Sequence, residues 1–481
     1  METGRNYQAL DSVEMENEEK RYLELARQKI AEGNYEESQK LLEELNLRRT
    51  NYINRRMRIN FADAEKQGHL NDFRKRQEEI ESIGKRIEAL AKDPKGTGEP
   101  SQAEDEVKRL EKERSDKRRD LQVYLTQLKK THPDLAALMG AKPLELTSLQ
   151  EQLPEATALL QYLMLADKLI VFVIRSRGID IAETEIKRSD LRERVKSLRR
   201  EIFAKVEGEN SRMIKPLSRE LYDRLIRPVE EGGKLKGIKV IGIAPNSFLH
   251  QLPFGVLIDR EDRYLVDRYG LFYMNSTSIL GVAMEREKQR VSGESMFLAI
   301  SNPDGSLAYA DREVADISKL FGKKAIYSQK EARKDVVQNQ QKGNSILHFS
   351  THGIFDPVDS TKSYLVMFDS KLTVEEIWGL PLKGIRLTVL SACETGIGEV
   401  LSGDDVVSLE NAFIYAGSPT VIATLWKVAD QSTAELMSLF YQNLMKGKDK
   451  TEALTEAQRQ LRERHDHPFF WAAFTVRGNW K

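Results

Sequence analysis

Two apolar runs in the C-terminal part of the sequence end on residues that could act as a base and a nucleophile. The run ILHFSTHG ends on His352 and Gly353, and the run LTVLSAC ends on Cys393, the single cysteine of the 481-residue chain. An imidazole can take the proton of a neighbouring thiol, and the resulting thiolate attacks carbonyl carbon atoms. Backbone N–H groups in the turns at Gly353 and Gly396 could stabilise the oxyanion that this attack creates. The pattern therefore predicts cysteine-dependent acyl chemistry.

A purely structural interpretation of the same residues stays open at this point. A free cysteine is commonly buried as a small hydrophobic residue, so both runs could be ordinary pieces of core. His348 has the same strand parity as His352 and is expected to point into the packing of the sheet. A zinc site made of His348, His352 and Cys393 lacks the helical spacing typical of histidine ligands, and we expect no metal and no cofactor. Three further histidines are expected to be packing, loop or helix-end residues: His250, His465 and His467.

The elements that must position the histidine and the cysteine begin near residue 134, where apolar runs alternate with amphipathic segments. Continuous apolar strands that alternate with helices indicate an α/β fold with a mostly parallel sheet covered on both faces. The working site of such a sheet lies beyond the carboxyl ends of its strands, where His352 and Cys393 fall. Strands are expected at 158–165, 168–174, 239–245, 295–301, 345–353, 364–368, 385–393 and 420–428. Helices are expected at 189–203, 311–322, 373–380, 404–417 and 430–447.

Residues 16–133 are expected to be entirely helical, behind a flexible segment 1–15. The stretch 22–45 is typical of two short amphipathic helices around a turn at Gly33–Asn34, similar to one tetratricopeptide-type hairpin without a second copy. Apolar residues then recur at heptad spacing on both sides of the Gly- and Pro-containing stretch 92–102, which predicts an antiparallel coiled-coil hairpin. The heptad residues are Phe73, Ile80, Ile83, Ile87, Leu90, Val107, Leu110, Leu121, Tyr124 and Leu128. We interpret this hairpin either as a structural stalk or as an arm that docks a regulatory partner.

Composition and charge narrow the class of protein. Lys and Arg together number 75, as do Asp and Glu, so the net charge is zero. This removes the bulk electrostatic attraction to nucleic acid or to an anionic membrane. One cysteine cannot form an internal disulfide bond, and the N-terminal residues have no apolar signal core, which together favour the cytoplasm. The longest apolar stretch, 162–174, contains Asp167 and Lys168 and is too short to span a bilayer.

The motifs in combination resemble a CHAT domain, a member of the caspase–separase group of cysteine peptidases. The resemblance runs from roughly residue 134 to the end of the chain, and the histidine precedes the cysteine by a distance similar to the roughly 50 residues of caspases. It implies an inactive protease-like half at 134–290 that supports an active half at 291–481. The matching stretches include APNSFLHQLPFGVLID, ILHFSTHGIFD, LTVLSACETGIGE, ENAFIYAGSPTVIATLWKVAD and HPFFWAAFTVRG.

The same resemblance implies a role for each candidate residue. Cys393 would be the nucleophile and His352 the general base and acid, and the backbone amides of Gly353 and Cys393 would form the oxyanion hole. The implied function is that of a cytoplasmic cysteine endopeptidase acting on a protein substrate, in a prokaryotic defence or signalling pathway. The helical N-terminus would regulate or recruit it, through a bound regulatory protein. The competing interpretation is a non-catalytic scaffold with a caspase-like fold, and another thiol chemistry such as acyl transfer also remains open.

Acidic residues that follow the cysteine are candidates for a substrate pocket. In separases and related basic-specific peptidases, an acidic residue one strand beyond the cysteine receives the P1 arginine or lysine, and Asp430 has the similar position here. Asp404 and Asp405 are assigned to the same pocket, although CHAT relatives more often carry a glutamate in this stretch. Asp430 is equally suited to be the N-cap of the helix at 430–447. The resemblance thus predicts cleavage after Arg or Lys.

Overall fold

The computed structural model describes most of the chain. The described residues are 2–56, 61, 64–92, 100–132, 135, 136, 139, 145–204, 212–288, 294–339, 345–356, 360–392, 408–426 and 430–481. Among the helices that these residues form, none combines the length and the apolarity that crossing a membrane requires.

Eleven strands among the described residues form one sheet in the order β3-β2-β1-β4-β5-β14-β13-β12-β8-β6-β7. The strands from the first half of the α/β region are β1 Thr157–Met164, β2 Lys168–Ile174, β3 Ile179–Glu185, β4 Val240–Ala244 and β5 Gly270–Tyr273. Those from the second half are β6 Met296–Ser301, β7 Lys323–Ser328, β8 Ser345–Thr351, β12 Ile385–Ala392, β13 Thr420–Thr424 and β14 Phe474–Gly478. A separate three-stranded sheet consists of β9 Gly353–Ile354, β10 Tyr364–Val366 and β11 Lys371–Thr373.

The sheet is mostly parallel and is continuous between its two halves. Antiparallel pairing is confined to β1–β2, β2–β3 and β13–β14 within the described main sheet. The halves are joined by β14, which pairs in parallel with β5 at Val476↔Phe272 and Arg477↔Tyr273. Trp480, just after β14, stacks on Phe272 with ring centroids 4.4 Å apart. The C-terminal strand therefore holds the two halves together as a single sheet.

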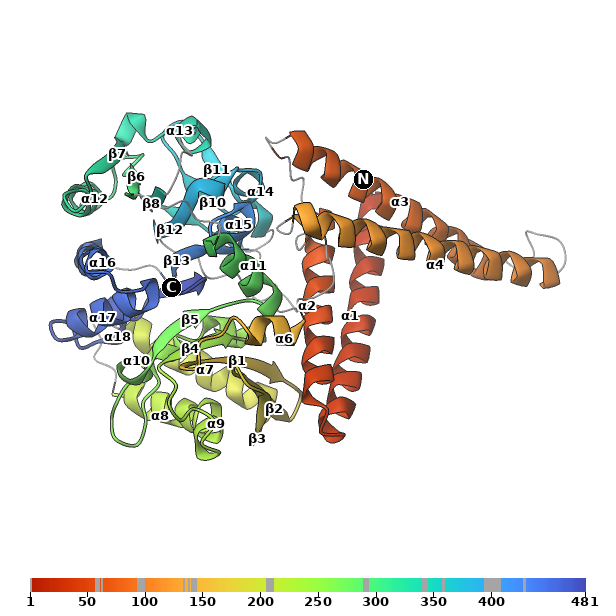
Figure 1. Ribbon diagram of the computed structural model, residues 1–481, viewed down its shortest axis with the longest axis horizontal. Coiled ribbons are helices and arrows are strands. Elements are labelled where there is room, and N and C mark those ends of the chain that lie inside the picture. Colours follow the sequence, from red (N-terminus) through yellow and green to blue (C-terminus); the bar gives the residue numbers. More distant parts are fainter. Residues whose placement is uncertain are drawn as a thin grey trace.

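Helices cover both faces of the sheet (Figure 1). In the second half α12, α16 and α17 lie on one face, and α14 and α15 lie on the other. The helices before β4 are α1 Glu2–Ala31, α2 Tyr35–Arg56, α3 Ala64–Lys92, α4 Pro100–Thr131, α6 Leu146–Gln150, α7 Arg188–Phe203, α8 Ile214–Leu225 and α9 Arg227–Glu231. Those after β4 are α10 Leu265–Arg268, α11 Thr277–Lys288, α12 Ala310–Ser318, α13 Lys334–Asn339, α14 Val374–Trp378, α15 Leu409–Ala416, α16 Asp430–Met445, α17 Lys450–Arg462 and α18 Pro468–Trp471.

The prediction of an α/β fold with a mostly parallel sheet is confirmed, and most predicted strands agree with observed ones within two residues. The segment 364–368 is a correction, because β10 pairs with β9 and β11 and is not part of the main sheet. Strands β3, β5 and β7 were not predicted. The first alternates apolar and polar residues as an edge strand, the second has only four residues, and the third begins with two exposed lysines. None of them is the long apolar run that reveals a buried strand.

The N-terminal helices α1 and α2 form an antiparallel hairpin that packs on the first half of the sheet. The turn between them contains Gly33 at a φ of +73°, the left-handed conformation that glycine adopts without a steric penalty. Residues 2–15, predicted to be a flexible segment, are part of α1. One buried cluster joins the hairpin to β1 and β2: Ala26, Ile30, Leu42, Leu163, Ile170 and Phe172. The first hairpin and the first half of the sheet therefore share a core, while the boundary expected between residues 133 and 134 lies outside the described residues and stays a prediction.

A buried carboxylate fixes this hairpin to the sheet. Glu43 of α2 is 1% exposed and accepts hydrogen bonds from the backbone amides of Thr277 and Ser278, each at 3.2 Å. It also accepts from Ser278 Oγ at 3.2 Å and from Gln161 Nε2 at 3.1 Å. Because Thr277 and Ser278 begin α11, the carboxylate lies at the positive end of that helix. Burial raises the pKa of Glu43, and the hydrogen bonds from Thr277 and Ser278 oppose the rise.

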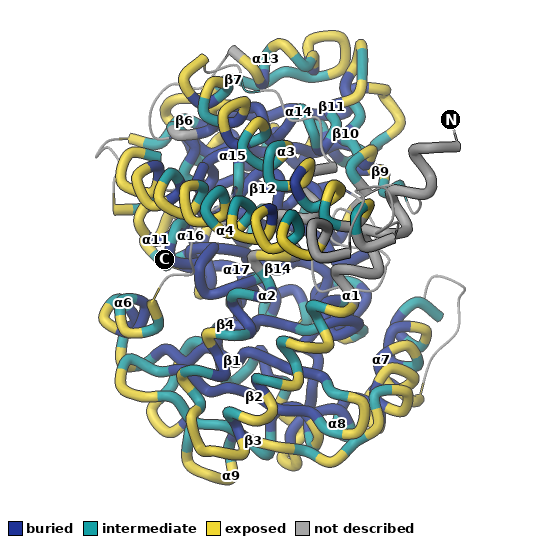
Figure 2. The backbone as a smooth tube through the Cα atoms, turned by 90° about the vertical axis from the view of Figure 1, so that its right-hand side faces the viewer, coloured by how far each residue is buried: buried dark blue, intermediate teal, exposed yellow. Residues whose placement is uncertain are grey.

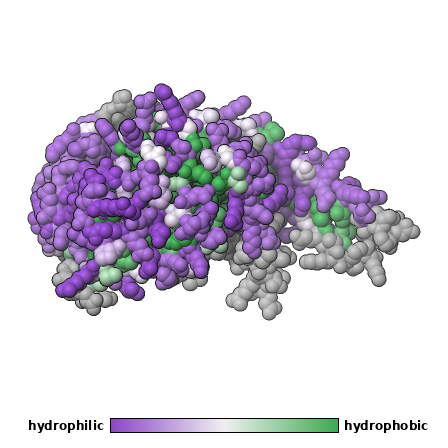
Figure 3. All heavy atoms as spheres, turned by 90° about the horizontal axis from the view of Figure 1, so that it is seen from below, coloured by the Kyte–Doolittle hydropathy of each residue, from purple (hydrophilic) through white to green (hydrophobic). Residues whose placement is uncertain are grey.

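The second hairpin, formed by α3 and α4, projects away from the α/β body (Figure 1). Its base is part of the body's core, since Leu70, Phe73, Leu125 and Leu128 are buried in the same cluster as Trp378 of α14. Exposed residues line much of the outer side of α4 (Figure 2). Seen from below, the surface is mainly hydrophilic (Figure 3). The structure thus confirms an antiparallel hairpin with a solvated outer face.

The docking of the first hairpin leads to a stability prediction. Glu43→Ala should lower the free energy of unfolding by roughly 2–4 kcal/mol, because it leaves several buried donors without an acceptor at about 1–3 kcal/mol each. Glu43→Gln, which keeps one carbonyl oxygen, should cost less. Chemical denaturation of the full chain gives the comparison, with Glu44→Ala as the control, since Glu44 is only half-buried and accepts one bond from Tyr22. Equal losses in Glu43→Ala and Glu44→Ala would contradict this role for Glu43.

Candidate active site

The parallel pairing of β8 with β12 determines where the two candidate catalytic residues emerge from the sheet. The last registered pairs are Ser391↔Ser350 and Ala392↔Thr351, and the next residues in the chain are Cys393 and His352. Neighbouring strands lie about 4.8 Å apart. His352 is described by the structure, whereas Cys393 lies outside the described residues.

His352 is held at the rim of the sheet by the loop that follows β6. Its side chain is 26% exposed, and its Nε2 atom lies 2.7 Å from Ser306 Oγ and 3.8 Å from Asp304 Oδ2. The backbone carbonyl of His352 accepts a hydrogen bond from the Val366 amide at 2.9 Å. The loop reaches the histidine because β6 and β8 are parallel neighbours, paired at Ser301↔Ser350, and end at the same edge.

The hydrogen bonds in this group assign the tautomer of the neutral imidazole. The Ser306 hydroxyl donates to Asp304 Oδ1 at 2.8 Å, and a hydroxyl has one proton to donate. Ser306 must therefore accept the hydrogen bond from His352, which places the imidazole proton on Nε2. The lone pair then lies on Nδ1, and among the described contacts of His352 this nitrogen is the one left to act as a base. Asp304, Ser306 and His352 form a chain of hydrogen bonds that orients the ring.

Asp304 is held in its ionised form. Burial by itself would raise the pKa of Asp304, but hydrogen bonds from the Ser306 hydroxyl and amide, together with the nearby His352 imidazole, bring it below its ordinary value. A carboxylate in this place stabilises a protonated imidazole electrostatically. Asp304 therefore presents a carboxylate to the Nε2 side of the His352 ring, at 3.8 Å.

The loop that carries Asp304 and Ser306 is itself fixed at both ends. Asn302 has a φ of +47°, an uncommon conformation for a residue other than glycine, and it is 5% exposed. Its amide donates to the Ser350 carbonyl of β8 at 2.9 Å, and its side chain donates to Asp311 of α12 at 3.0 Å. Its Oδ1 atom accepts from the Leu307 amide at 2.9 Å. This tethering explains how an exposed serine can orient the histidine.

A buried polar network lies under the strand ends. His348, at 0% exposure, is bonded through Nε2 to Glu313 Oε1 at 2.8 Å and through Nδ1 to Tyr441 Oη at 3.0 Å. The other oxygen of Glu313 accepts from Ser391 Oγ at 3.2 Å. Burial raises the pKa of Tyr441 well above its usual value. The network ties α12 and α16 to β8 and β12, and it confirms that His348 points into the packing.

The backbone amide of Gly353, an expected oxyanion-hole donor, does not face the small sheet. Gly353 of β9 pairs with Leu365 of β10. The adjacent pair, His352 and Val366, is joined by a hydrogen bond from the Val366 amide to the His352 carbonyl. Because hydrogen-bonded and non-hydrogen-bonded pairs alternate along antiparallel strands, Gly353 and Leu365 form no hydrogen bonds with each other. The Gly353 N–H therefore points away from β10. The carbonyl of Ala392, just before Cys393, accepts from Thr424 Oγ1 of β13 at 2.7 Å, which fixes the end of β12.

The structure describes one of the three acidic residues of the expected pocket, Asp430. Asp404 and Asp405 lie outside the described residues. Asp430 is the first residue of α16, which follows β13, and β13 is the parallel neighbour of β12. Its backbone thus lies one strand beyond the strand that leads to Cys393. As the first helical residue, Asp430 lies within one position of the expected N-cap of α16, and its role in a pocket stays a prediction.

Three further histidines lie in a buried 3₁₀ helix, at the start of a helix and beyond the end of a helix. His250 is 4% exposed in a short 3₁₀ helix, and the His467 side chain accepts from the Phe469 amide at 3.2 Å at the start of α18. His465 lies beyond α17, 3.7 Å from Glu435. Sequence analysis missed Asp304 and Ser306, because Asn-Pro-Asp-Gly-Ser after a strand has the composition of an ordinary turn.

The sheet and its two-sided helical cover define an α/β protein with a mostly parallel sheet, and His352 directly follows one of its strands. The chain belongs to the CHAT-domain family, since the CHAT domain profile matches residues 215–479. This match confirms the resemblance drawn from the sequence motifs.

Individual relatives and solved structures share a low sequence identity with this chain. Tetratricopeptide repeat protein 28 of Homo sapiens is 25% identical over 332 residues, and that of Mus musculus is 25% identical over 328 residues. Each alignment covers 56% of this chain and 13% of the relative, so the chain spans a small part of the curated proteins it matches. The separase of the Saccharomyces cerevisiae separase–securin complex aligns with a TM-score of 0.44 and 11% identity, over 69% of this chain and 30% of that chain. The Arg-specific cysteine proteinase gingipain R aligns with a TM-score of 0.40 and 12% identity, over 57% and 69%.

The site geometry predicts how Asp304 responds to loss of Ser306. Ser306→Ala should raise the pKa of the Asp304 carboxyl toward the ordinary aspartate value of about 3.9, because the hydroxyl bond to the ionised form is lost. Since the folded pKa of Asp304 is lowered, its stabilising contribution is present above the ordinary value and is lost as the pH falls through the folded value.

Carboxyl carbon NMR titration of the wild type and the variant measures this shift. Ser370→Ala is the matched control, because the Ser370 hydroxyl donates to Asp369 in the same way at 3.0 Å. An Asp304 titration that is the same in Ser306→Ala as in the wild type would show that the serine does not hold the carboxylate.

Proposed function

We propose that this protein is a cysteine endopeptidase that uses Cys393 as nucleophile and His352 as general base and acid. The observation that supports this most is the register of β8 and β12, from which the two residues follow as neighbours at the carboxyl edge of the sheet. Membership of the CHAT-domain family supports the same assignment.

The proposed reaction begins with transfer of the Cys393 thiol proton to Nδ1 of His352. The thiolate attacks the carbonyl carbon of the scissile peptide bond, and the N–H groups of Gly353 and Cys393 stabilise the oxyanion. The protonated imidazole then donates from Nδ1 to the leaving amine, which breaks the C–N bond and leaves a thioester on Cys393. A water molecule, deprotonated by His352, hydrolyses the thioester and restores the thiol.

Asp304 and Ser306 act as positioning residues in this scheme. The imidazole is positively charged between the proton transfers, and the Asp304 carboxylate 3.8 Å from Nε2 lowers the energy of that charge. Ser306 keeps Nε2 turned away from the thiol, so that Nδ1 alone exchanges the proton. The steps require no metal ion or organic cofactor.

The proposed substrate is a protein cleaved after Arg or Lys. An acidic residue one strand beyond the nucleophile would pair with the P1 cation, and Asp430 occupies that place in the chain. Asp404 and Asp405 would add to the negative potential of the pocket. A charge-assisted pair of this kind contributes roughly 1.5–3 kcal/mol, which corresponds to tenfold or greater discrimination.

The helical N-terminus is proposed to control access to the site or to recruit substrate. The hairpin of α3 and α4 offers long, solvated faces for a regulatory protein, while its base shares a core with the active half. Such control by a partner fits a cytoplasmic signalling or defence protease.

The central test is proteolysis by variants of the dyad. Cys393→Ala and His352→Ala should each lower kcat/KM for a cleaved peptide by at least roughly 10³-fold, and the double variant should be no worse than either. A peptide library is screened for cleavage by mass spectrometry, with His465→Ala as a control histidine away from the strand ends. Cleavage that persists in Cys393→Ala would end the peptidase assignment. An absence of cleavage by the wild type on every substrate would favour the scaffold alternative.

A second test separates the two roles of Asp430. If the residue binds the P1 cation, Asp430→Ala and Asp430→Asn should both lose about tenfold or more of the preference for Arg over Asp at P1. If it only caps α16, Asp430→Asn should behave as the wild type, because asparagine caps as well as aspartate, and Asp430→Ala should lose about 1 kcal/mol of stability. Matched peptides and thermal unfolding distinguish these outcomes.

A further inference from the structure

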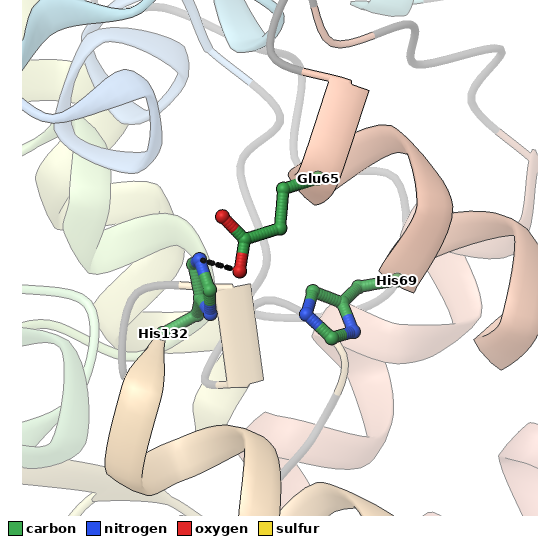
Figure 4. Close-up of side chains that lie close together, drawn as sticks. All are labelled: Glu65, His69 and His132. Carbon is green, nitrogen blue, oxygen red and sulfur yellow. Dashed lines mark ion pairs between the residues drawn. The ribbon is translucent and has the colours of Figure 1, made fainter.

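Three potential metal ligands converge at the base of the α3–α4 hairpin, away from the strand-end site. Glu65 and His69 lie on the first turns of α3, and His132 follows the last residue of α4 (Figure 4). One ligand atom from each residue lies within 4.8 Å of the others. In Figure 4 the two rings and the carboxylate face one another.

The backbone places these side chains with little freedom to separate. Glu65 and His69 are four residues apart on one helix and so share a face. The amide of His132 donates to the Leu128 carbonyl at 2.7 Å, which extends the helical turn of α4 to the histidine. The ring centroids of His69 and His132 lie 5.1 Å apart, and His132 Nε2 lies 3.7 Å from Glu65 Oε1.

Hydrogen bonds set both imidazoles in the form that binds a metal through Nε2. The Tyr124 hydroxyl donates to the His69 carbonyl at 3.1 Å, so it must accept from His69 Nδ1, also at 3.1 Å. The Thr131 hydroxyl donates to the Leu128 carbonyl at 3.3 Å, so it must accept from His132 Nδ1 at 3.1 Å. Each ring therefore has its proton on Nδ1 and its lone pair on Nε2. Metal-binding histidines are commonly oriented in this way, with the other ring nitrogen bonded to a protein group.

We propose that Glu65, His69 and His132 bind one zinc ion. Two imidazole nitrogens and one carboxylate oxygen are ligands that Zn²⁺ accepts, whereas Mg²⁺ and Ca²⁺ prefer oxygen alone. Bonds of about 2.0–2.2 Å require the ligand atoms to approach to about 3.4 Å. The Glu65 side chain can make most of this movement, since it is 70% exposed. Among the described residues these three side chains are the ligands that converge, and water or a partner's side chain can take the fourth coordination position.

The ion would clamp the start of α3 to the end of α4. Leu70 and Leu128, close to the ligands in the chain, are buried in the core that the hairpin shares with the α/β body. Zinc therefore stiffens the point from which the hairpin projects. This inference is independent of the proposed peptidase activity.

The test measures zinc binding to the full-length chain after treatment with a chelator. Isothermal titration with zinc chloride is done in a Cys393→Ala background, so that no thiolate contributes. One zinc should bind per chain, and His69→Ala, His132→Ala and Glu65→Gln should each weaken binding at least tenfold. His465→Ala is the matched control, because its ring also lies 3.7 Å from a glutamate carboxylate. Zinc should also slow hydrogen exchange in 64–73 and 124–132, and should not do so in the His69→Ala/His132→Ala variant.

Two results would overturn the proposal. One is the absence of stoichiometric zinc binding in the parent chain. The other is unchanged affinity in the His69→Ala/His132→Ala variant, with folding verified by circular dichroism. Glu65→Gln alters an exposed side chain, so it tests the site even if a histidine variant fails to fold.

Discussion

The parallel pairing of β8 with β12 is the constraint on which the rest of the candidate site depends. Parallel strands deliver their carboxyl ends to one edge of the sheet, so residues separated by a whole helical connection become neighbours there. The buried bonds from Glu313 to His348 and Ser391 lock this pairing from one face of the sheet. The chemistry proposed at the edge is possible only because the two strands cannot slide past one another.

Beyond the strand ends, the site depends on a chain of single hydrogen bonds whose direction is determined. Ser306 has one proton, and Asp304 takes it, so the imidazole of His352 must donate from Nε2. An exposed turn can perform this function because Asn302, in an uncommon backbone conformation, fixes it to β8 and to α12. In the same way, the hydroxyls of Tyr124 and Thr131 each donate their one proton to a backbone carbonyl. They must therefore accept from Nδ1 of His69 and His132, which assigns the tautomers of these two rings.

The helical N-terminus consists of two hairpins that contact the α/β body in different ways. The first hairpin substitutes for covering helices on β1 and β2, and its buried Glu43 lies at the positive end of α11. Among its described residues, the second hairpin joins the core of the body at its base and projects away from the body along the rest of its length. Regulation by a partner would therefore act through the second hairpin, while the first is part of the folded core.

The sequence by itself determined the features that repeat or alternate over short distances. Apolar strands, amphipathic helices and the heptads of the second hairpin are visible because side-chain direction follows the local backbone period. The motifs around His352 and Cys393 were visible for the same reason, as ends of apolar runs. Only the tertiary structure revealed Asp304 and Ser306, the docking of Glu43 on α11, and the place of β14 between the two halves. These contacts join residues far apart in the chain, and no local pattern encodes which distant strand, loop or helix end a given polar residue will meet.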